Sequence, residues 1–309
     1  MSLDLGARQV VESLSGVDLV QLSSYGPTDK TPDVVLLSPH AGKSRQLVDR
    51  MGGSFDDDPG IVDDYLNIDA DFGADALAHE IANQISQLSG DLRVDVVQVL
   101  FERGIVDPNR ITGLARRNVI DFGQISKHEN FLKMIHLETI RIINKILSQI
   151  DENKGLFLDI HSMAPYTPKD LIAEYPGRLK TYNYYYREKS QRGARRHLDL
   201  ITDIPGRGMI ANPIVFRNVY GALTDNGESF RQNNPYPLAN FPSMQIVGTK
   251  YMIEHAGLTL DYPKDRLTKG EAESENWDIA NLEVDDNKVE YMAKIIAGAV
   301  IQSLREIRS

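Results

Sequence analysis

Acidic, imidazole and guanidinium side chains follow several apolar runs of this sequence. Asp159 and His161 lie in Gly155–Met163, G-L-F-L-D-I-H-S-M, which has the length and apolar content of a buried strand. Residues two apart on a strand point to the same face, so both side chains leave one face near the carboxyl end. Neutral imidazole is the commonest protein ligand of zinc, and a nearby carboxylate commonly orients its other nitrogen. The alternative is a core histidine bonded to a neighbouring aspartate.

Further polar groups follow three other apolar runs. They are His40 after Asp33–Ser38, the stretch Arg103–Arg110 after Arg93–Leu100, and Asp261 in Gly257–Tyr262. Each of these runs is enriched in apolar or β-branched residues, as strands are. Open α/β sheets bind ligands at the carboxyl ends of their strands. The four groups are therefore expected to share one edge of a sheet.

The composition limits what such a group of side chains can do. The chain has no cysteine, which excludes disulfides, thiolate zinc sites and cysteine nucleophiles, so any metal must be held by His, Asp and Glu. The net charge of -10 argues against a protein that coats nucleic acid or an anionic membrane. No uncharged apolar run reaches about 18 residues, and the first residues do not resemble a secretory signal. We therefore expect a soluble, cytoplasmic protein.

Helical patterns alternate with the predicted strands. They cover Lys43–Met51, Ala74–Leu88, Glu129–Ile150 and about 288–308, with a further helix over Met244–His255 and a first strand at Val17–Ser24. This alternation implies parallel pairing with right-handed crossovers. The 309 residues, 41% of them hydrophobic, suffice for one large core. We predict a single α/β domain with three layers, α/β/α, around a mixed, mostly parallel sheet.

Two stretches differ in composition from the rest of the chain. Tyr166–His197 is dense in Tyr and Arg, a mixture that can bind single-stranded nucleic acid by stacking and phosphate contact. Because the chain is acidic and has no second such stretch, we interpret it as an insertion or flap beside a pocket. Residues 210–242 are rich in Asn, Pro and Gly and predict long loops, which are often functional in compact domains.

Four motifs occur in an order that resembles one known family. They are P-H-A-G at 39–42, D-A-D-F-G-A-D-A-L at 69–77, R-G-I-V-D-P-N-R at 103–110 and D-I-H-S at 159–162. Together they span about half of the chain and resemble the motifs of N-formylglutamate amidohydrolases, a family distantly similar to carboxypeptidase A-type zinc hydrolases. The resemblance implies a phosphorylase/hydrolase-like fold and one zinc ion.

The resemblance also implies a set of metal ligands. His40 and His161 would be the imidazole ligands, and Asp71 the carboxylate ligand, with Asp69 as its substitute if the register slips by two. Such a set leaves the fourth position of a tetrahedral zinc for water, as in catalytic sites. The alternative for either aspartate is to cap a helix that begins near Ala74.

Arg103, Asn109 and Arg110 match the family's substrate-anchoring stretch. A planar guanidinium binds a carboxylate through two parallel hydrogen bonds, and acyl amino acids carry one or two carboxylates. Arg103 would also stabilise an oxyanion. The alternative is that these arginines pair with nearby aspartates. We interpret Asp107 as an internal partner of this turn and Asp159 as a supporting carboxylate for the metal site.

The catalytic carboxylate would be Asp261, where the related enzymes carry a glutamate. An aspartate is one methylene shorter, so the water or the backbone must shift to stay within hydrogen-bond reach. Glu254 is the alternative general base. The implied function is zinc-dependent hydrolysis of the amide of a small N-acyl amino acid, with N-formylglutamate first in line. Alternatives are a metallocarboxypeptidase or peptidoglycan amidase, a non-catalytic binder of acidic metabolites, and a metal-free core of paired Asp and Arg.

Overall fold

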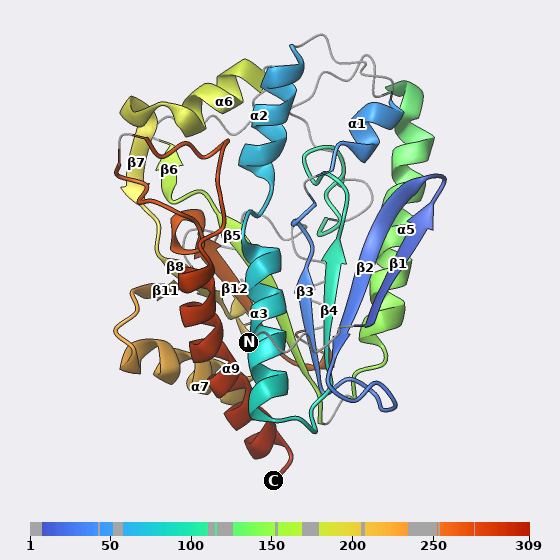
Figure 1. Cartoon of the computed structure of the whole chain (residues 1–309), viewed down its shortest axis with the longest axis vertical. Helices are drawn as coiled ribbons and strands as arrows, with labels where there is room; N and C mark the ends of the chain where they lie inside the picture. Colours follow the sequence, from blue (N-terminus) through green and yellow to red (C-terminus); the bar gives the residue numbers. More distant parts are fainter. Residues whose placement is uncertain are drawn as a thin grey trace.

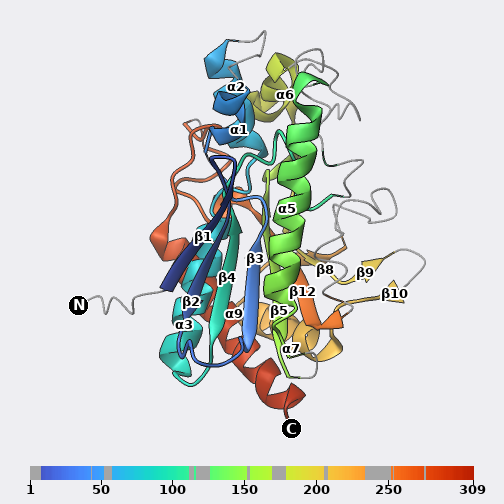
Figure 2. The same cartoon turned by 90° about the vertical axis from the view of Figure 1, so that its right-hand side faces the viewer.

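The computed structural model describes most of the chain and shows a central sheet between layers of helices. The described residues are 8–42, 44–51, 58–110, 115, 126–151, 154–168, 179–204, 208–233, 252, 254–274 and 276–309. Figure 1 views the sheet with helices α3 and α9 in front of it, and Figure 2 shows α5 on the opposite side. The predicted three-layer α/β/α class is therefore confirmed.

The sheet has eight strands in the described part of the chain, in the order β1-β2-β4-β3-β5-β12-β8-β11. The four central strands β4, β3, β5 and β12 are mutually parallel, while β2 and β8 run antiparallel to their neighbours β4 and β12. Their bounds are β1 Arg8–Leu14, β2 Val17–Tyr25, β3 Val34–Ser38, β4 Val94–Val99, β5 Leu156–Met163, β8 Leu198–Ile201, β11 Phe230–Gln232 and β12 Ala256–Pro263. The mixed sheet with a parallel centre agrees with the prediction.

Helices cover both faces and the carboxyl end of this sheet. Their bounds are α1 Gln46–Arg50, α2 Pro59–Asp69, α3 Ala74–Leu88, α5 Glu129–Leu147, α6 Leu179–Arg187, α7 Pro213–Asp225 and α9 Asp286–Ile307. Helix α3 packs on α9 and on the strands β2 to β5, whereas α5 packs on β1 and β2. Helices α1, α2 and α6 lie beyond the carboxyl ends of β3 and β4, at the top of Figure 1.

Short pieces of regular structure complete the described part of the chain. They are the 3-10 helices η2 Ser126–His128, η3 Lys189–Gln191 and η5 Lys264–Arg266, and the paired short strands β6 Tyr166–Pro168 with β7 Arg192–Arg195 and β9 Asp203–Ile204 with β10 Gly208–Met209. Among the described residues, no helix combines the length and the apolar content that crossing a membrane would need.

The apolar patterns explain why the central elements form. Every residue of β5 and of β12 is buried, as expected for parallel strands covered on both faces. Helix α3 buries Leu77, Ile81 and Ile85, which recur at helical spacing, while its polar residues other than Ser86 are half-buried or exposed. Gly73 begins this helix with a φ of 89°, in the left-handed region that glycine adopts without strain.

The prediction of long loops over residues 210–242 is wrong for much of that stretch. Residues 213–225 form α7, and β11 follows. The side chain of Asn212 accepts hydrogen bonds from the amides of Ile214 and Val215, and Pro213 occupies the first turn, where a missing amide hydrogen costs nothing. Asn and Pro here start a helix rather than mark a loop. Residues 234–242 and most of the predicted helix Met244–His255 lie outside the described residues.

Gly42 allows the loop after β3 to approach the end of β4. A Cβ added at this glycine would overlap the carbonyl oxygen of Phe101, so any larger residue must push the two segments apart. The glycine of the motif P-H-A-G therefore fixes the position of His40, two residues earlier, relative to the segment that carries Arg103.

We expect Gly42→Ala to lower the free energy of unfolding by about 2 kcal/mol or more, because the added methyl group has no room and the backbone must move. Gly221→Ala is a matched control: its Cβ meets nothing within 4 Å inside α7, and an alanine in a helix interior should stabilise by about 0.5–1 kcal/mol. Chemical denaturation of both variants measures the difference. Equal stability of the two variants would contradict this account of Gly42.

Candidate metal centre

Two histidines and one aspartate meet at the carboxyl edge of the parallel strands. His161 Nδ1 lies 2.9 Å and His40 Nδ1 3.2 Å from Asp71 Oδ2. The two rings are 4.9 Å apart between centroids, and all three residues are buried. One ligand atom from each residue lies within 4.8 Å of the others, a grouping that could hold a metal ion. The convergence of His40 and His161 predicted from the sequence is therefore present.

The sheet explains why these three residues meet. His161 lies in β5, and His40 follows the neighbouring parallel strand β3 by two residues. Asp71 follows α2, and its backbone amide donates to the carbonyl of His40 at 2.9 Å. A backbone hydrogen bond thus joins the segment after α2 to the segment after β3, and the Asp71 carboxylate also reaches His161 in β5.

A second carboxylate lies beside the outer nitrogen of each ring, hydrogen-bonded to His40 and ion-paired with His161. Asp107 Oδ1 lies 2.8 Å from His40 Nε2, and Asp159 Oδ1 lies 3.0 Å from His161 Nε2. Carboxylates in this position fix the tautomer and orientation of metal-binding histidines. Asp159 occupies the supporting place predicted for it, while Asp107 contacts a histidine as well as its own turn.

Arg103 defines the hydrogen-bonding state of His40. Its Nη1 donates to His40 Nδ1 at 2.9 Å and to Asp71 Oδ1 at 2.7 Å. A guanidinium can only donate, so Nδ1 of His40 accepts, and the hydrogen on Nε2 is donated to Asp107. The lone pair of His40 Nδ1 is therefore taken up by Arg103, and a metal bound at this nitrogen would replace that hydrogen bond.

The electrostatic environment favours charged forms at the centre. Burial raises the pKa of Asp71, but the charge of Arg103 and the hydrogen bond from His161 outweigh it and hold this pKa well below its usual value. Burial lowers the pKa of His161, but the carboxylates of Asp159 and Asp71 outweigh burial and hold it well above its usual value. Both shifts follow from opposite charges placed close together in a dry interior.

The two aspartates considered as carboxylate ligands lie in different surroundings. Asp69 accepts a hydrogen bond from the Tyr182 hydroxyl at 3.1 Å and lies 3.4 Å from Arg103 Nε. Asp71 contacts both histidines. The residue that fits the ligand role is therefore Asp71, and Asp69 orients the guanidinium beside it.

The predicted substrate anchors lie among aspartates. Arg103 contacts Asp107 as well as Asp71: its Nη2 lies 3.7 Å from Asp107 Oδ2. Arg110 Nε lies 3.1 Å from the same oxygen. The backbone amide of Asn109 donates to the Asp107 carboxylate at 3.0 Å. The side-chain oxygen of Asn109 is buried. The pairing of these arginines with aspartates, the alternative considered from the sequence, is thus the arrangement in this structure.

Asp261 lies beside the centre on the next strand. It pairs in register with His161 across β5 and β12, so the two side chains share one face of the sheet. It is buried, and its Oδ1 has no hydrogen-bond partner among the described residues. Burial, together with the nearby charge of Asp71, raises the pKa of Asp261 to about 6. Glu254 is exposed and precedes the amino end of β12, so it does not fit the role of general base.

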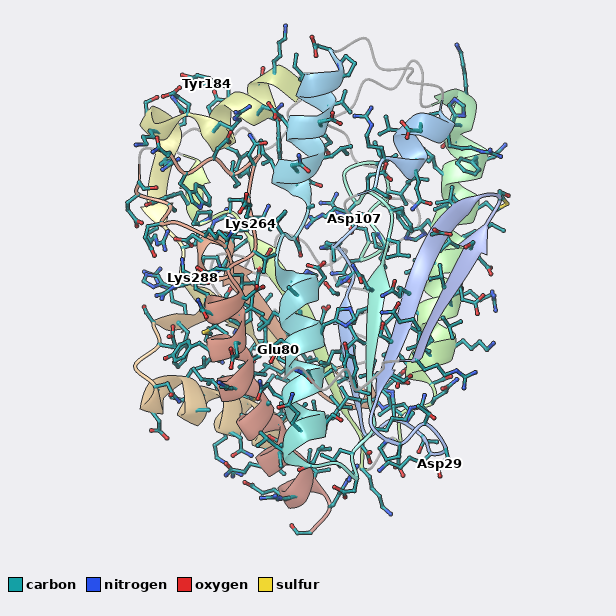
Figure 3. All side chains as sticks on the ribbon, in the orientation of Figure 1. Asp29, Glu80, Asp107, Tyr184, Lys264 and Lys288 are labelled. Atoms are coloured by element: carbon teal, nitrogen blue, oxygen red, sulfur yellow. The ribbon has the colours of Figure 1, made fainter. Side chains whose placement is uncertain are left out.

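Lys264 is a buried cation near the centre that the sequence did not indicate. Its Nζ donates to the carbonyl of Ile68 at 2.5 Å, which ties the end of α2 to the turn after β12. Figure 3 shows it beside the end of α2, with Asp107 above β3 and β4. Burial lowers the pKa of Lys264 to about 8, against the opposing charges of Asp71 and Asp69. The only feature of the sequence that could have indicated Lys264 is its position directly after Pro263, at the end of the strand that carries Asp261.

The donor set fits a divalent metal. Five buried aspartates gather here with three cationic side chains, Arg103, Arg110 and Lys264; the aspartates are Asp69, Asp71, Asp107, Asp159 and Asp261. His161 adds a fourth cation while it holds its proton. Once it gives up that proton to bind a metal, the carboxylates exceed the cationic side chains, and a divalent ion held by two imidazoles and one carboxylate would offset this excess. Such a set suits zinc.

A small aromatic pocket lies beyond the carboxyl end of β5. It is lined by Ala164, Pro165, Tyr166, Tyr185, Tyr186, Arg192, Trp277 and Ile279. Its connection to the centre runs through Tyr182, whose ring lies 4.7 Å from that of Tyr186 and whose hydroxyl bonds to Asp69. The Tyr- and Arg-rich segment thus borders the site.

Comparisons with known proteins identify the fold. No family model matches the chain, and no curated protein matches it in sequence. A gene product of Agrobacterium tumefaciens has a similar structure, with 15% identity and a TM-score of 0.56 over 94% of this chain and 96% of that one. N-formylglutamate amidohydrolase from Ralstonia eutropha is similar, with 13% identity and a TM-score of 0.54 over 93% and 98%. The shared fold agrees with the resemblance carried by the sequence motifs.

We expect Asp107→Asn and Asp159→Asn each to weaken zinc binding by about 10–100-fold, because each removes the carboxylate that orients one imidazole. Asp33→Asn is a matched control, since Asp33 also loses ion pairs, to Lys30 and Arg308, but lies at the opposite end of the sheet. Competition with a chromophoric chelator measures the affinities. Unchanged zinc affinity in both site variants would contradict this arrangement.

Zinc binding at pH 7 should release about one proton, and zinc affinity should fall as pH falls, because only the neutral imidazole binds a metal. The metal-free His161 holds its proton, since Asp159 and Asp71 raise its pKa well above the usual value. Calorimetry in two buffers of different ionisation enthalpy counts the proton. A heat of binding that does not depend on the buffer would contradict the protonation assigned to His161.

Proposed function

We propose that this protein is a metal-dependent, zinc-type amidohydrolase that acts on a small N-acyl amino acid, with N-formylglutamate as the leading substrate and formate and glutamate as products. The observation that carries the proposal is the convergence of His40, Asp71 and His161, with the buried acid Asp261 on the adjacent strand. The similar fold of an N-formylglutamate amidohydrolase supports the choice of substrate.

The chain supplies the ligands, and a divalent ion would supply the Lewis acid. When bound by His40, Asp71 and His161, such an ion polarises a carbonyl and lowers the pKa of a water molecule. Asp107 and Asp159 keep both imidazoles in the orientation that binding needs. Burial of the whole set excludes bulk water and strengthens each electrostatic interaction.

Asp261 acts as the general base and then as the general acid in this proposal. Its pKa of about 6 leaves it ionised at neutral pH, yet close enough to neutrality to take a proton from water and return it to the leaving nitrogen. Its Oδ1 meets no donor among the described side chains, so this oxygen is available for the transferred proton.

Arg103, Arg110 and Asn109 hold the charged parts of the substrate and of the transition state. Arg103 touches both His40 and Asp71, so its guanidinium lies where negative charge develops on the carbonyl oxygen. Arg110 is about one-fifth exposed at its side chain (21%), which lets it meet a substrate carboxylate while it contacts Asp107.

A second candidate is hydrolysis of a longer substrate, as by a metallocarboxypeptidase or a peptidoglycan amidase. The pocket lined by Tyr166, Tyr185, Tyr186 and Trp277 favours it, because aromatic walls beside the centre could hold a further residue. In that case the segment 166–197 would act as a flap over an extended cleft. A panel of peptide and cell-wall fragments separates the two, since a deformylase with an enclosed site should reject them.

We expect Asp261→Asn to retain zinc and to lose about 10²–10⁴-fold in kcat on N-formyl-L-glutamate, because it removes the general base. His161→Ala should lose both zinc and turnover. Glu254→Gln is the control: Glu254 is exposed, and its substitution should leave zinc content and turnover unchanged. In the wild type, kcat/KM should fall as pH falls through the pKa of Asp261, because the base must be ionised. Steady-state kinetics and elemental analysis test these outcomes.

Two results would overturn the assignment. One is retention of zinc and activity in His161→Ala. The other is a zinc-loaded wild type that binds N-formyl-L-glutamate without hydrolysing it, which would make the protein a binder of acidic metabolites.

A further inference from the structure

We infer that Arg196 is a second carboxylate anchor, on the opposite side of Asp261 from Arg103 and Arg110, and that it selects substrates whose amino-acid side chain is acidic. The inference rests on the proposed function, since it names the substrate class of the same site.

The sheet places Arg196 at the site edge. It precedes β8, which runs antiparallel to β12 with Asp199 opposite Asp261, so the chain before β8 lies at the carboxyl end of β12. Its backbone amide donates to the carbonyl of Pro165 at 2.7 Å, two residues after β5 ends. Arg196 therefore lies beyond the ends of the two strands that carry His161 and Asp261.

The side chain of Arg196 is held but not enclosed. Its Nε donates to the hydroxyl of Thr167 at 3.3 Å, and the residue is half-buried. Its charge acts on Asp261, where it opposes the rise in pKa that burial causes. A guanidinium within electrostatic reach of the general base, and still partly open to solvent, is suited to a ligand carboxylate.

The two groups of arginines divide the site. The guanidinium of Arg103 lies on His40, which follows β3, whereas Arg196 leads into β8, with β5 and β12 between. Three strand spacings of about 4.8 Å separate their strands by roughly 14 Å. An N-acylated acidic amino acid carries two carboxylates, one for each group of arginines.

The chemistry of the contact gives specificity. A guanidinium binds a carboxylate by charge-assisted hydrogen bonds, and a neutral amide of the same shape offers only one weak acceptor oxygen. Discrimination between an acidic substrate and its amide is therefore expected, and it should appear in substrate binding, as KM, because Arg196 does not touch the reacting amide.

The test compares N-formyl-L-glutamate with N-formyl-L-glutamine on the zinc-loaded full chain. The wild type should prefer the glutamate substrate, and Arg196→Gln should lower kcat/KM for it by about 10–100-fold, mainly through KM. The same variant should leave the glutamine substrate nearly unchanged, and Arg196→Lys should restore part of the preference. Arg217→Gln is the control. Arg217 is an exposed arginine of α7 that pairs with Glu306, and its substitution should leave kcat/KM for both substrates unchanged.

Equal losses on both substrates in Arg196→Gln, or a wild type without preference, would overturn the inference while the proposed hydrolysis stands. If the zinc-loaded wild type hydrolyses neither substrate, the proposed function fails, and calorimetric titration with L-glutamate and L-glutamine decides the inference alone. Selective loss of L-glutamate affinity in Arg196→Gln supports it. Equal affinities in the variant and the wild type, or no L-glutamate binding, contradict it.

Discussion

Two imidazole rings face one buried carboxylate oxygen, and a further carboxylate holds the outer nitrogen of each ring. Charged and polar groups are costly to bury unless each has a partner, so this arrangement constrains everything near it. The orientation of the His40 ring depends on the position of Asp107, and that of the His161 ring on the position of Asp159. Arg103 must be close enough to balance Asp71, and it is held in turn by Asp69.

The sheet meets these constraints with neighbouring parallel strands. His161 comes from β5, His40 from the end of β3 and Asp261 from β12, so three of the groups owe their spacing to strand pairing. Asp71 comes from the segment after helix α2. Its position depends on the hydrogen bond from its backbone amide to the carbonyl of His40, and on the hydrogen bond from Lys264 to the carbonyl of Ile68. The rigid part of the site thus lies in the sheet, while loops supply its remaining charges.

The sequence predicted the parts of the site that depend on local pattern. The apolar runs around 156–163 and 256–263 are long and uninterrupted, so both central strands were found, and with them the shared edge that carries His161 and Asp261. Helix α2 was missed because its Asp-rich composition hid the Asp58-Pro59 start, where Asp58 accepts a hydrogen bond from the amide of Gly60. Helix α7 was missed for a similar reason at Asn212-Pro213.

Other features depend on contacts between distant segments and leave no local pattern. The contact between Asp107 and His40 joins residues 67 apart in the chain, and Lys264 reaches a carbonyl 196 residues away. The choice of Asp71 over Asp69 also depends on which carboxylate the turn after α2 directs at the rings. Spacing alone could not decide these points, because both aspartates lie in the same motif.

X-ray absorption spectroscopy of the zinc-loaded protein tests the central claim most directly. The account predicts four-coordinate zinc with two imidazole nitrogens at about 2.0–2.1 Å and one carboxylate oxygen at about 2.0–2.2 Å. Any zinc that remains in His40→Ala should carry one imidazole instead of two. A spectrum without imidazole scattering, or one that is the same in His40→Ala, would contradict it.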